Sequence, residues 1–103
     1  MEAFRNSRVA ILDDDQLVCE NLTEVIRTWG LSAEGFTNPE TALVHIRENG
    51  CDIVLLDVFI GDCCGLDLIP QIGTEASDLK IIVITGFADK DMAIRALQLG
   101  AFD

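Results

Sequence analysis

The stretch Val9-Ala10-Ile11-Leu12-Asp13-Asp14-Asp15 decides the fold, because an apolar run passes directly into three consecutive acids. A short continuous apolar run is typical of a strand buried on both faces, as in a parallel sheet covered by helices. Two further runs of this kind are Ile53-Val54-Leu55-Leu56 and Ile81-Ile82-Val83-Ile84-Thr85. Residues Ser32 to Phe36 form a weaker strand candidate, which we expect nearer an edge of the sheet.

Helical patterns occupy the segments between these runs. The first pattern ends at Gly30, and its predicted buried stripe consists of Leu17, Val18, Leu22, Val25, Ile26 and Trp29. The second begins at Asn38-Pro39, an N-cap followed by Pro at the first helical position, and ends at Gly50. A third helix is predicted over Leu66 to Ile72 and a fourth from Asp89 to Gly100.

The alternation of strands and helices predicts right-handed crossovers and a doubly wound α/β domain. A chain of 103 residues accommodates one domain, so a single domain is predicted over residues 1–103. Hydrophobic residues make up 50% of the sequence, a share that favours a packed core over disorder.

Charge and hydropathy exclude several classes of partner. Seven Lys and Arg stand against 18 Asp and Glu, and the resulting net charge of −11 disfavours binding to nucleic acid or anionic lipid. The apolar runs fall far short of the ~20 residues that span a membrane, and the polar N-terminus lacks a secretory apolar segment. We therefore predict a cytoplasmic protein, whose four cysteines, including the adjacent Cys63 and Cys64, are reduced thiols.

Polar residues that can do chemistry follow each confident strand. They are Asp13-Asp14-Asp15 after the first, Asp57 after the third and Thr85 after the fourth. In an open parallel sheet, ligands bind outside the carboxyl ends of the strands, so these side chains are expected to converge there. Adjacent carboxylates repel one another, and a hard cation such as Mg²⁺ relieves this repulsion. Asp57 then fits the role of a nucleophile that forms an acyl phosphate. Asp15 is either a further acid of the cluster or only a helix cap.

From Arg8 to Asp103, including the closing Ala96-Leu97-Gln98-Leu99-Gly100-Ala101-Phe102-Asp103, the sequence resembles the receiver domain of two-component response regulators. The resemblance implies a flavodoxin-like (CheY-like) three-layer sandwich with strand order 2-1-3-4. It also implies that Asp57 is the phosphoacceptor and that Thr85 contacts the phosphoryl group. Four groups are implied to hold Mg²⁺ or Mn²⁺: Asp14 directly, Asp13 partly through water, Asp57, and the backbone carbonyl of Phe59.

The sequence departs from this family in two places. Gly61 stands where the family usually has Pro, and Cys64 where an Asp is common, so the loop from Gly61 to Gly65 is expected to be more flexible than usual. The chain also ends at Asp103, before the family's fifth strand, its fifth helix and a Lys that pairs with the phosphoryl group. An incomplete domain of this kind exposes its fourth strand as an edge, which predicts a possible homodimer.

Two functional hypotheses follow. The first is a signalling switch that takes a phosphoryl group from a sensor histidine kinase onto Asp57 and passes the change to a C-terminal effector domain absent from this chain. Such a switch phosphorylates itself and loses the phosphate slowly, so it is not a turnover enzyme. The alternative is a degenerate receiver that binds partners without being phosphorylated. A haloacid dehalogenase-like hydrolase is set aside, because it usually has a second Asp where this chain has Phe59.

Overall fold

The structure is a computed structural model in which residues 7–57, 59–60, 63–75 and 79–84 are described. In chain order its elements are β1 (Arg8–Leu12), α1 (Gln16–Thr28), β2 (Ser32–Phe36), α2 (Pro39–Asn49), β3 (Ile53–Asp57), β4 (Phe59–Ile60), β5 (Cys63–Cys64), a 3₁₀ helix (Gly65–Leu68), α3 (Ile69–Glu75) and β6 (Lys80–Ile84). The predicted fourth helix, Asp89 to Gly100, lies outside the described residues. Within them, no helix is long and apolar enough to cross a membrane.

Four strands form a parallel sheet in the order β2-β1-β3-β6, which confirms the predicted order 2-1-3-4. The register pairs Val9 with Ile53 and Leu12 with Leu56, so β1 and β3 end side by side. A second, two-stranded sheet pairs β4 with β5 in antiparallel fashion. This short pairing lies where the sequence predicted only a loop.

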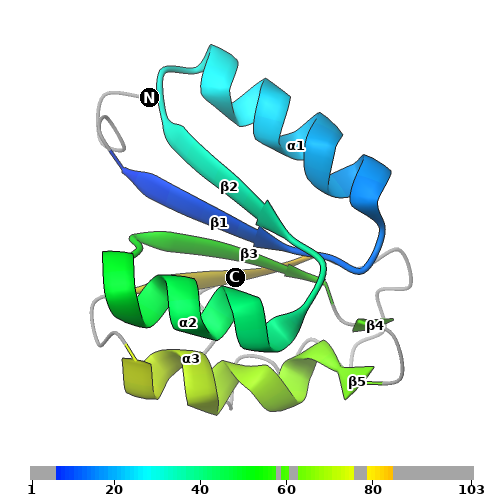
Figure 1. The fold of residues 1–103 in the computed structure, drawn as a ribbon, viewed down its shortest axis with the longest axis vertical. Helices are drawn as coiled ribbons and strands as arrows, with labels where there is room; N and C mark the ends of the chain where they lie inside the picture. The colour runs from blue at the N-terminus through cyan, green and yellow to red at the C-terminus, as the bar shows by residue number, and fades with distance from the viewer. Residues whose placement is uncertain (1–6, 58, 61–62, 76–78, 85–103) are drawn as a thin grey trace.

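Helix α1 covers one face of the sheet, and α2 and α3 cover the other (Figure 1). The side chains of β1 alternate between the two resulting cores, with Val9 and Ile11 in the first and Ala10 and Leu12 in the second. The sandwich therefore has the three predicted layers. Because both faces of β1 are covered, its sequence is a continuous apolar run.

The buried face of α1 differs from the predicted stripe. Its buried residues are Cys19, Thr23 and Ile26, whereas Leu17 is 63% exposed and Trp29 is 56% exposed. The prediction that Trp29 belongs to the core is thus wrong. Trp29 is the C-cap residue, at which the chain has already left helical geometry, so helical spacing no longer fixes the direction of its side chain.

The predicted start of the second helix is confirmed by its cap geometry. The Asn38 side chain accepts hydrogen bonds from the backbone N–H groups of Glu40 (2.8 Å) and Thr41 (3.2 Å), with Pro39 at the first helical position. The third helix differs from its prediction. It begins as a 3₁₀ turn at Gly65 and continues as α3 to Glu75, three residues past the predicted end at Ile72.

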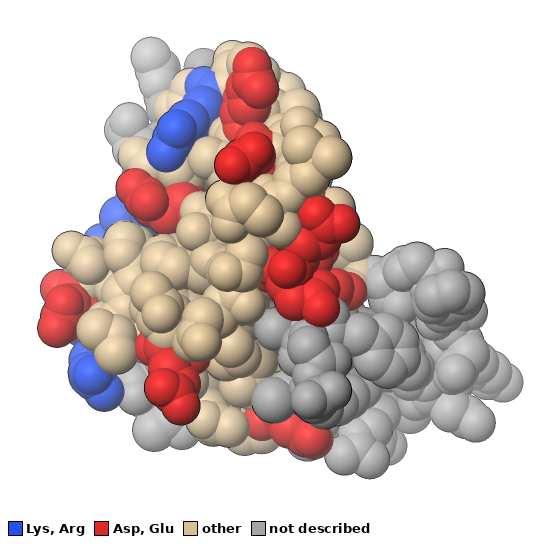
Figure 2. Space-filling model, turned by 45° about the vertical axis from the view of Figure 1, so that its right-hand side comes forward, with Lys and Arg blue, Asp and Glu red and all other residues tan. Residues whose placement is uncertain are grey.

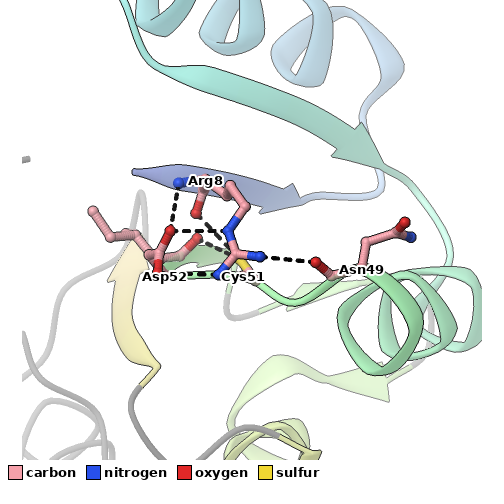
Figure 3. Close-up of polar contacts among 5 residues, drawn as sticks. Arg8, Asn49, Cys51 and Asp52 are labelled. Carbon is pink, nitrogen blue, oxygen red and sulfur yellow. Dashed lines mark hydrogen bonds and ion pairs between the residues drawn. The ribbon is translucent and has the colours of Figure 1, made fainter. Parts of the chain in front are cut away.

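A polar clasp joins β1 to β3 at the amino end of the sheet (Figure 3). The Nε atom of Arg8 donates to Asp52 Oδ2 at 3.1 Å, the backbone N–H of Arg8 donates to the same oxygen at 2.7 Å, and Nη1 donates to the carbonyl of Asn49 at 2.8 Å. Gly50 has φ of 77°, and a Cβ there would lie 2.6 Å from Arg8 Nη1. The clasp therefore depends on glycine at position 50.

Candidate functional site

Three carboxylates converge at the carboxyl edge of the sheet, as the sequence predicted. Asp13 and Asp14 directly follow β1, and Asp57 is the last residue of the neighbouring strand β3. One carboxylate oxygen from each residue lies within 4.8 Å of the others. Asp13 and Asp57 are partly buried and Asp14 is exposed. The group is therefore partly withdrawn from water on one side and open to it on the other.

Hydrogen bonds around Asp13 set its position. Its backbone N–H donates to the carbonyl of Phe36 at the end of β2 (3.1 Å), and its Oδ1 accepts from the backbone N–H of Asp15 (2.9 Å). Its own carbonyl accepts from the thiol of Cys19 at 3.2 Å. The Asp13 residue is thus held by contacts to β2, to the following loop and to α1.

Asp15 has a different role from its two neighbours. Its Oδ1 accepts hydrogen bonds from the backbone N–H groups of Leu17 (2.9 Å) and Val18 (3.3 Å), so its carboxylate caps α1. This settles the alternative that the sequence left open. The cap also stabilises the turn in which Asp13 and Asp14 lie, because it fixes where the helix begins.

The donor set fits a hard divalent cation. Carboxylate oxygens are the ligands that Mg²⁺ and Ca²⁺ prefer, and three of them held this close repel one another unless a cation lies between them. Acidic side chains are also more widespread than basic ones on the described surface that Figure 2 presents. The two remaining predicted site residues are Phe59 and Thr85. Phe59 lies in β4, two residues after Asp57, and Thr85 lies outside the described residues.

Cys19 contacts the backbone of the site, a contact that the sequence did not reveal. The sequence indicated only a small apolar side chain, and its burial is confirmed at 2% exposure. The structure adds that its thiol faces two carbonyls, those of Asp13 (3.2 Å) and Phe36 (3.4 Å). Burial raises the pKa of the Cys19 thiol above its ordinary value, so the group carries its proton at neutral pH.

The fold and the site together define a flavodoxin-like α/β domain with an acidic cluster at the carboxyl edge of its sheet. A family model described as the response regulator receiver domain matches residues 9–103, and the chain belongs to this family. Among curated proteins, it is 36% identical over 99 residues to the response regulator protein TodT of Pseudomonas putida, a match that covers 96% of this chain and 44% of that protein. It is 34% identical to the phosphoglycerate transport system transcriptional regulatory protein PgtA of Salmonella typhimurium, covering 92% of this chain and 23% of that protein. The chain thus spans less than half the length of these relatives.

Solved structures of response regulators have the same fold. A response regulator from Thermotoga maritima has a TM-score of 0.85 and 28% identity, with coverage of 95% of this chain and 82% of that one. A response regulator from Burkholderia pseudomallei, solved with a phosphorylated aspartic acid, a calcium ion and citrate, has a TM-score of 0.88. Its identity of 24%, over 93% of this chain and 56% of that one, supports the fold alone.

Proposed function

We propose that this receiver domain accepts a phosphoryl group on Asp57 from the phosphohistidine of a sensor histidine kinase. The observation that carries the proposal is the convergence of Asp13, Asp14 and Asp57, with carboxylate oxygens within 4.8 Å of one another at the carboxyl edge of the sheet. Nothing in the described residues favours the degenerate alternative, because all three acids are present there and lie together.

In the proposed step, a carboxylate oxygen of Asp57 attacks the phosphorus atom. A P–O bond forms as the P–N bond of the phosphohistidine breaks, and the imidazole nitrogen leaves with the electron pair. Asp57 suits this role because it ends a strand, which fixes its backbone while its side chain faces the open edge. The product is an acyl phosphate, whose later hydrolysis regenerates the carboxylate and makes the domain a self-limiting switch rather than a turnover enzyme.

A divalent cation, with Mg²⁺ as the proposed ion, supplies positive charge opposite the phosphoryl oxygens when it is bound. Asp13, Asp14, Asp57 and the backbone carbonyl of Phe59 are the proposed groups that hold it. The hydrogen bonds of Asp13 orient its carboxylate within this donor set. Thr85 is proposed to donate its hydroxyl to the phosphoryl group, as the family resemblance implies.

The proposed partners follow from the relatives. PgtA is described as a transcriptional regulatory protein and TodT as a response regulator, and each is more than twice as long as this chain. We propose that the phosphorylated domain acts, in the cytoplasm, through an effector domain outside these 103 residues, and that it does not bind nucleic acid itself. Its net charge of −11 supports the second part.

Self-association along β6 is a separate part of the proposal. Within the described sheet, β6 pairs with β3 on one side only. A second copy could add a strand at the other side. Sedimentation velocity at increasing concentration tests this, and a monomer at all concentrations would count against it.

Intact mass spectrometry tests the central proposal. The chain is incubated with acetyl phosphate, with and without Mg²⁺, beside Asp57→Asn and the matched variant Asp52→Asn. Asp52 lies at the opposite end of the sheet, so its variant controls for the loss of one carboxylate. We expect one phosphoryl group on the unchanged chain and on Asp52→Asn, only with Mg²⁺, and none on Asp57→Asn. Equal phosphorylation of Asp57→Asn would refute the assignment.

A further inference from the structure

Cys19 lies directly behind the acidic site and contacts the backbone that carries it. Its side chain is 2% exposed, and its Sγ lies 3.2 Å from the carbonyl oxygen of Asp13 and 3.4 Å from that of Phe36. The Phe36 carbonyl already accepts the backbone N–H of Asp13 at 3.1 Å. Since a thiol has one proton, Asp13, whose carbonyl is nearer, is the better placed acceptor.

A second observation shows that the fold is built to allow this approach. Gly35 in β2 faces α1, and a Cβ at this position would lie 3.0 Å from Cys19 Cβ and 3.2 Å from Thr23 Oγ1. A side chain at position 35 would therefore require Cys19 and Thr23 on α1 to shift by a few tenths of an ångström. Such a shift would change the distances from the thiol to the two carbonyls at the ends of β1 and β2.

We propose that Cys19 is a positioning residue of the acidic site: its thiol fixes the carbonyl of Asp13 and so keeps the Asp13 carboxylate directed at Asp14 and Asp57. This inference rests on the proposed function, because it assumes that the three carboxylates hold a divalent cation. The physical reason is preorganisation. Asp13 is held at its N–H by Phe36, at its carboxylate by the Asp15 N–H and at its carbonyl by the thiol, and groups that orient a metal ligand contribute to metal affinity.

Cys51 provides a matched control within the same chain. It is also buried, at 7% exposure, and its Sγ also faces two carbonyls, those of Ile53 (3.1 Å) and Arg8 (3.4 Å). However, it lies at the amino end of the sheet, away from the acids. Replacement of either thiol removes a small buried group and a weak donor, but only Cys19 has contact with the site.

The test is a Mg²⁺ titration followed by the amide chemical shifts of Asp13 and Asp14, on the whole chain and its variants. For Cys19→Ala we expect a half-saturating Mg²⁺ concentration higher by roughly three- to ten-fold, at or below the lower end of what orienting groups contribute, because a thiol is a weak donor. Cys51→Ala should stay within about two-fold of the unchanged chain, since its contacts lie at the far edge. Cys19→Ser keeps a donor and should recover most of the loss.

Gly35→Ala is a second route to the same outcome, because its Cβ would crowd Cys19 Cβ and Thr23 while the thiol itself is kept. It should weaken Mg²⁺ binding in the same direction, and it decides the question if Cys19→Ala does not fold. Equal Mg²⁺ affinity of the unchanged chain and the folded Cys19 or Gly35 variants would overturn the positioning role while leaving the proposed function intact. If the unchanged chain neither binds Mg²⁺ nor takes a phosphoryl group, the proposed function fails and the inference fails with it.

Discussion

Neutralising one acid of the cluster should stabilise the chain in the absence of divalent cations. The variant is Asp14→Asn, at the exposed member of the group. Two unit charges 4.8 Å apart repel by about 0.9 kcal/mol in a water-like dielectric, and Asp14 takes part in two such pairs. Salt at physiological strength, with a Debye length of about 8 Å, reduces the sum of the two to about 1 kcal/mol. For a domain of this size that is a rise in Tm of roughly 5 °C.

Thermal unfolding in EDTA, followed by circular dichroism, measures this change. Glu24→Gln is the matched control, because it removes one negative charge from the exposed surface of α1, more than two turns from the cluster. The difference between the two variants should shrink at high salt. Addition of Mg²⁺ should reverse the order, raising the Tm of the unchanged chain above that of Asp14→Asn. A Tm of Asp14→Asn in EDTA equal to or below that of Glu24→Gln would show that the carboxylates do not repel one another appreciably.

Further predictions concern the scaffold. Hydrogen bonds from Arg8 lower the pKa of the Asp52 carboxyl. Its contribution to stability is therefore present above its unfolded pKa, near 4, and is lost as pH falls through the lower folded value. In urea unfolding, Asp52→Asn should be less stable than the unchanged chain at pH 6 and should converge with it at low pH. Gly50→Ala should cost about 1–3 kcal/mol of stability because of its strained backbone. It should lower the Tm more than Gly30→Ala, because Gly30 also has a positive φ, of 85°, but has nothing within 4 Å of its Cβ position. Thermal unfolding compares the two variants, and equal losses of Tm would contradict a role for the Arg8 contact. Asp15→Ala should cost about 1 kcal/mol through loss of the α1 cap, measured by urea unfolding, with no change expected if the cap contributes nothing.

The strands were predictable from the sequence because their signal is local. The runs at Val9–Leu12, 53–56 and 81–84 are apolar because both faces of the sheet are covered, and all three became sheet strands. The convergence of Asp13 and Asp57 was predictable for a related reason. Residues that follow neighbouring parallel strands must emerge at one edge, whatever the details of packing.

Other features depend on contacts that no local pattern encodes. Whether Trp29 is buried depends on where α1 ends and on which face of the helix packs against the sheet. Thr23 is buried because Gly35, which has no side chain, lies opposite it. The hydrogen bonds of Cys19 join residues 6 and 17 positions apart. The sequence shows a small buried side chain at position 19, but not which carbonyls it meets.

The two ends of β1 and β3 carry opposite electrostatic arrangements, and this contrast connects stability with function. At the amino end, Arg8 and Asp52 pair through unlike charges and are joined by the backbone bond from Asp52 N–H to the Arg8 carbonyl at 2.9 Å. At the carboxyl end, the same two strands lead into Asp13 and Asp57, whose like charges oppose their approach. A slip of one residue in the register would send alternate side chains to the wrong face and displace the acids from each other. The Arg8–Asp52 clasp at the amino end therefore helps to maintain the register that brings the repelling carboxylates together at the carboxyl end.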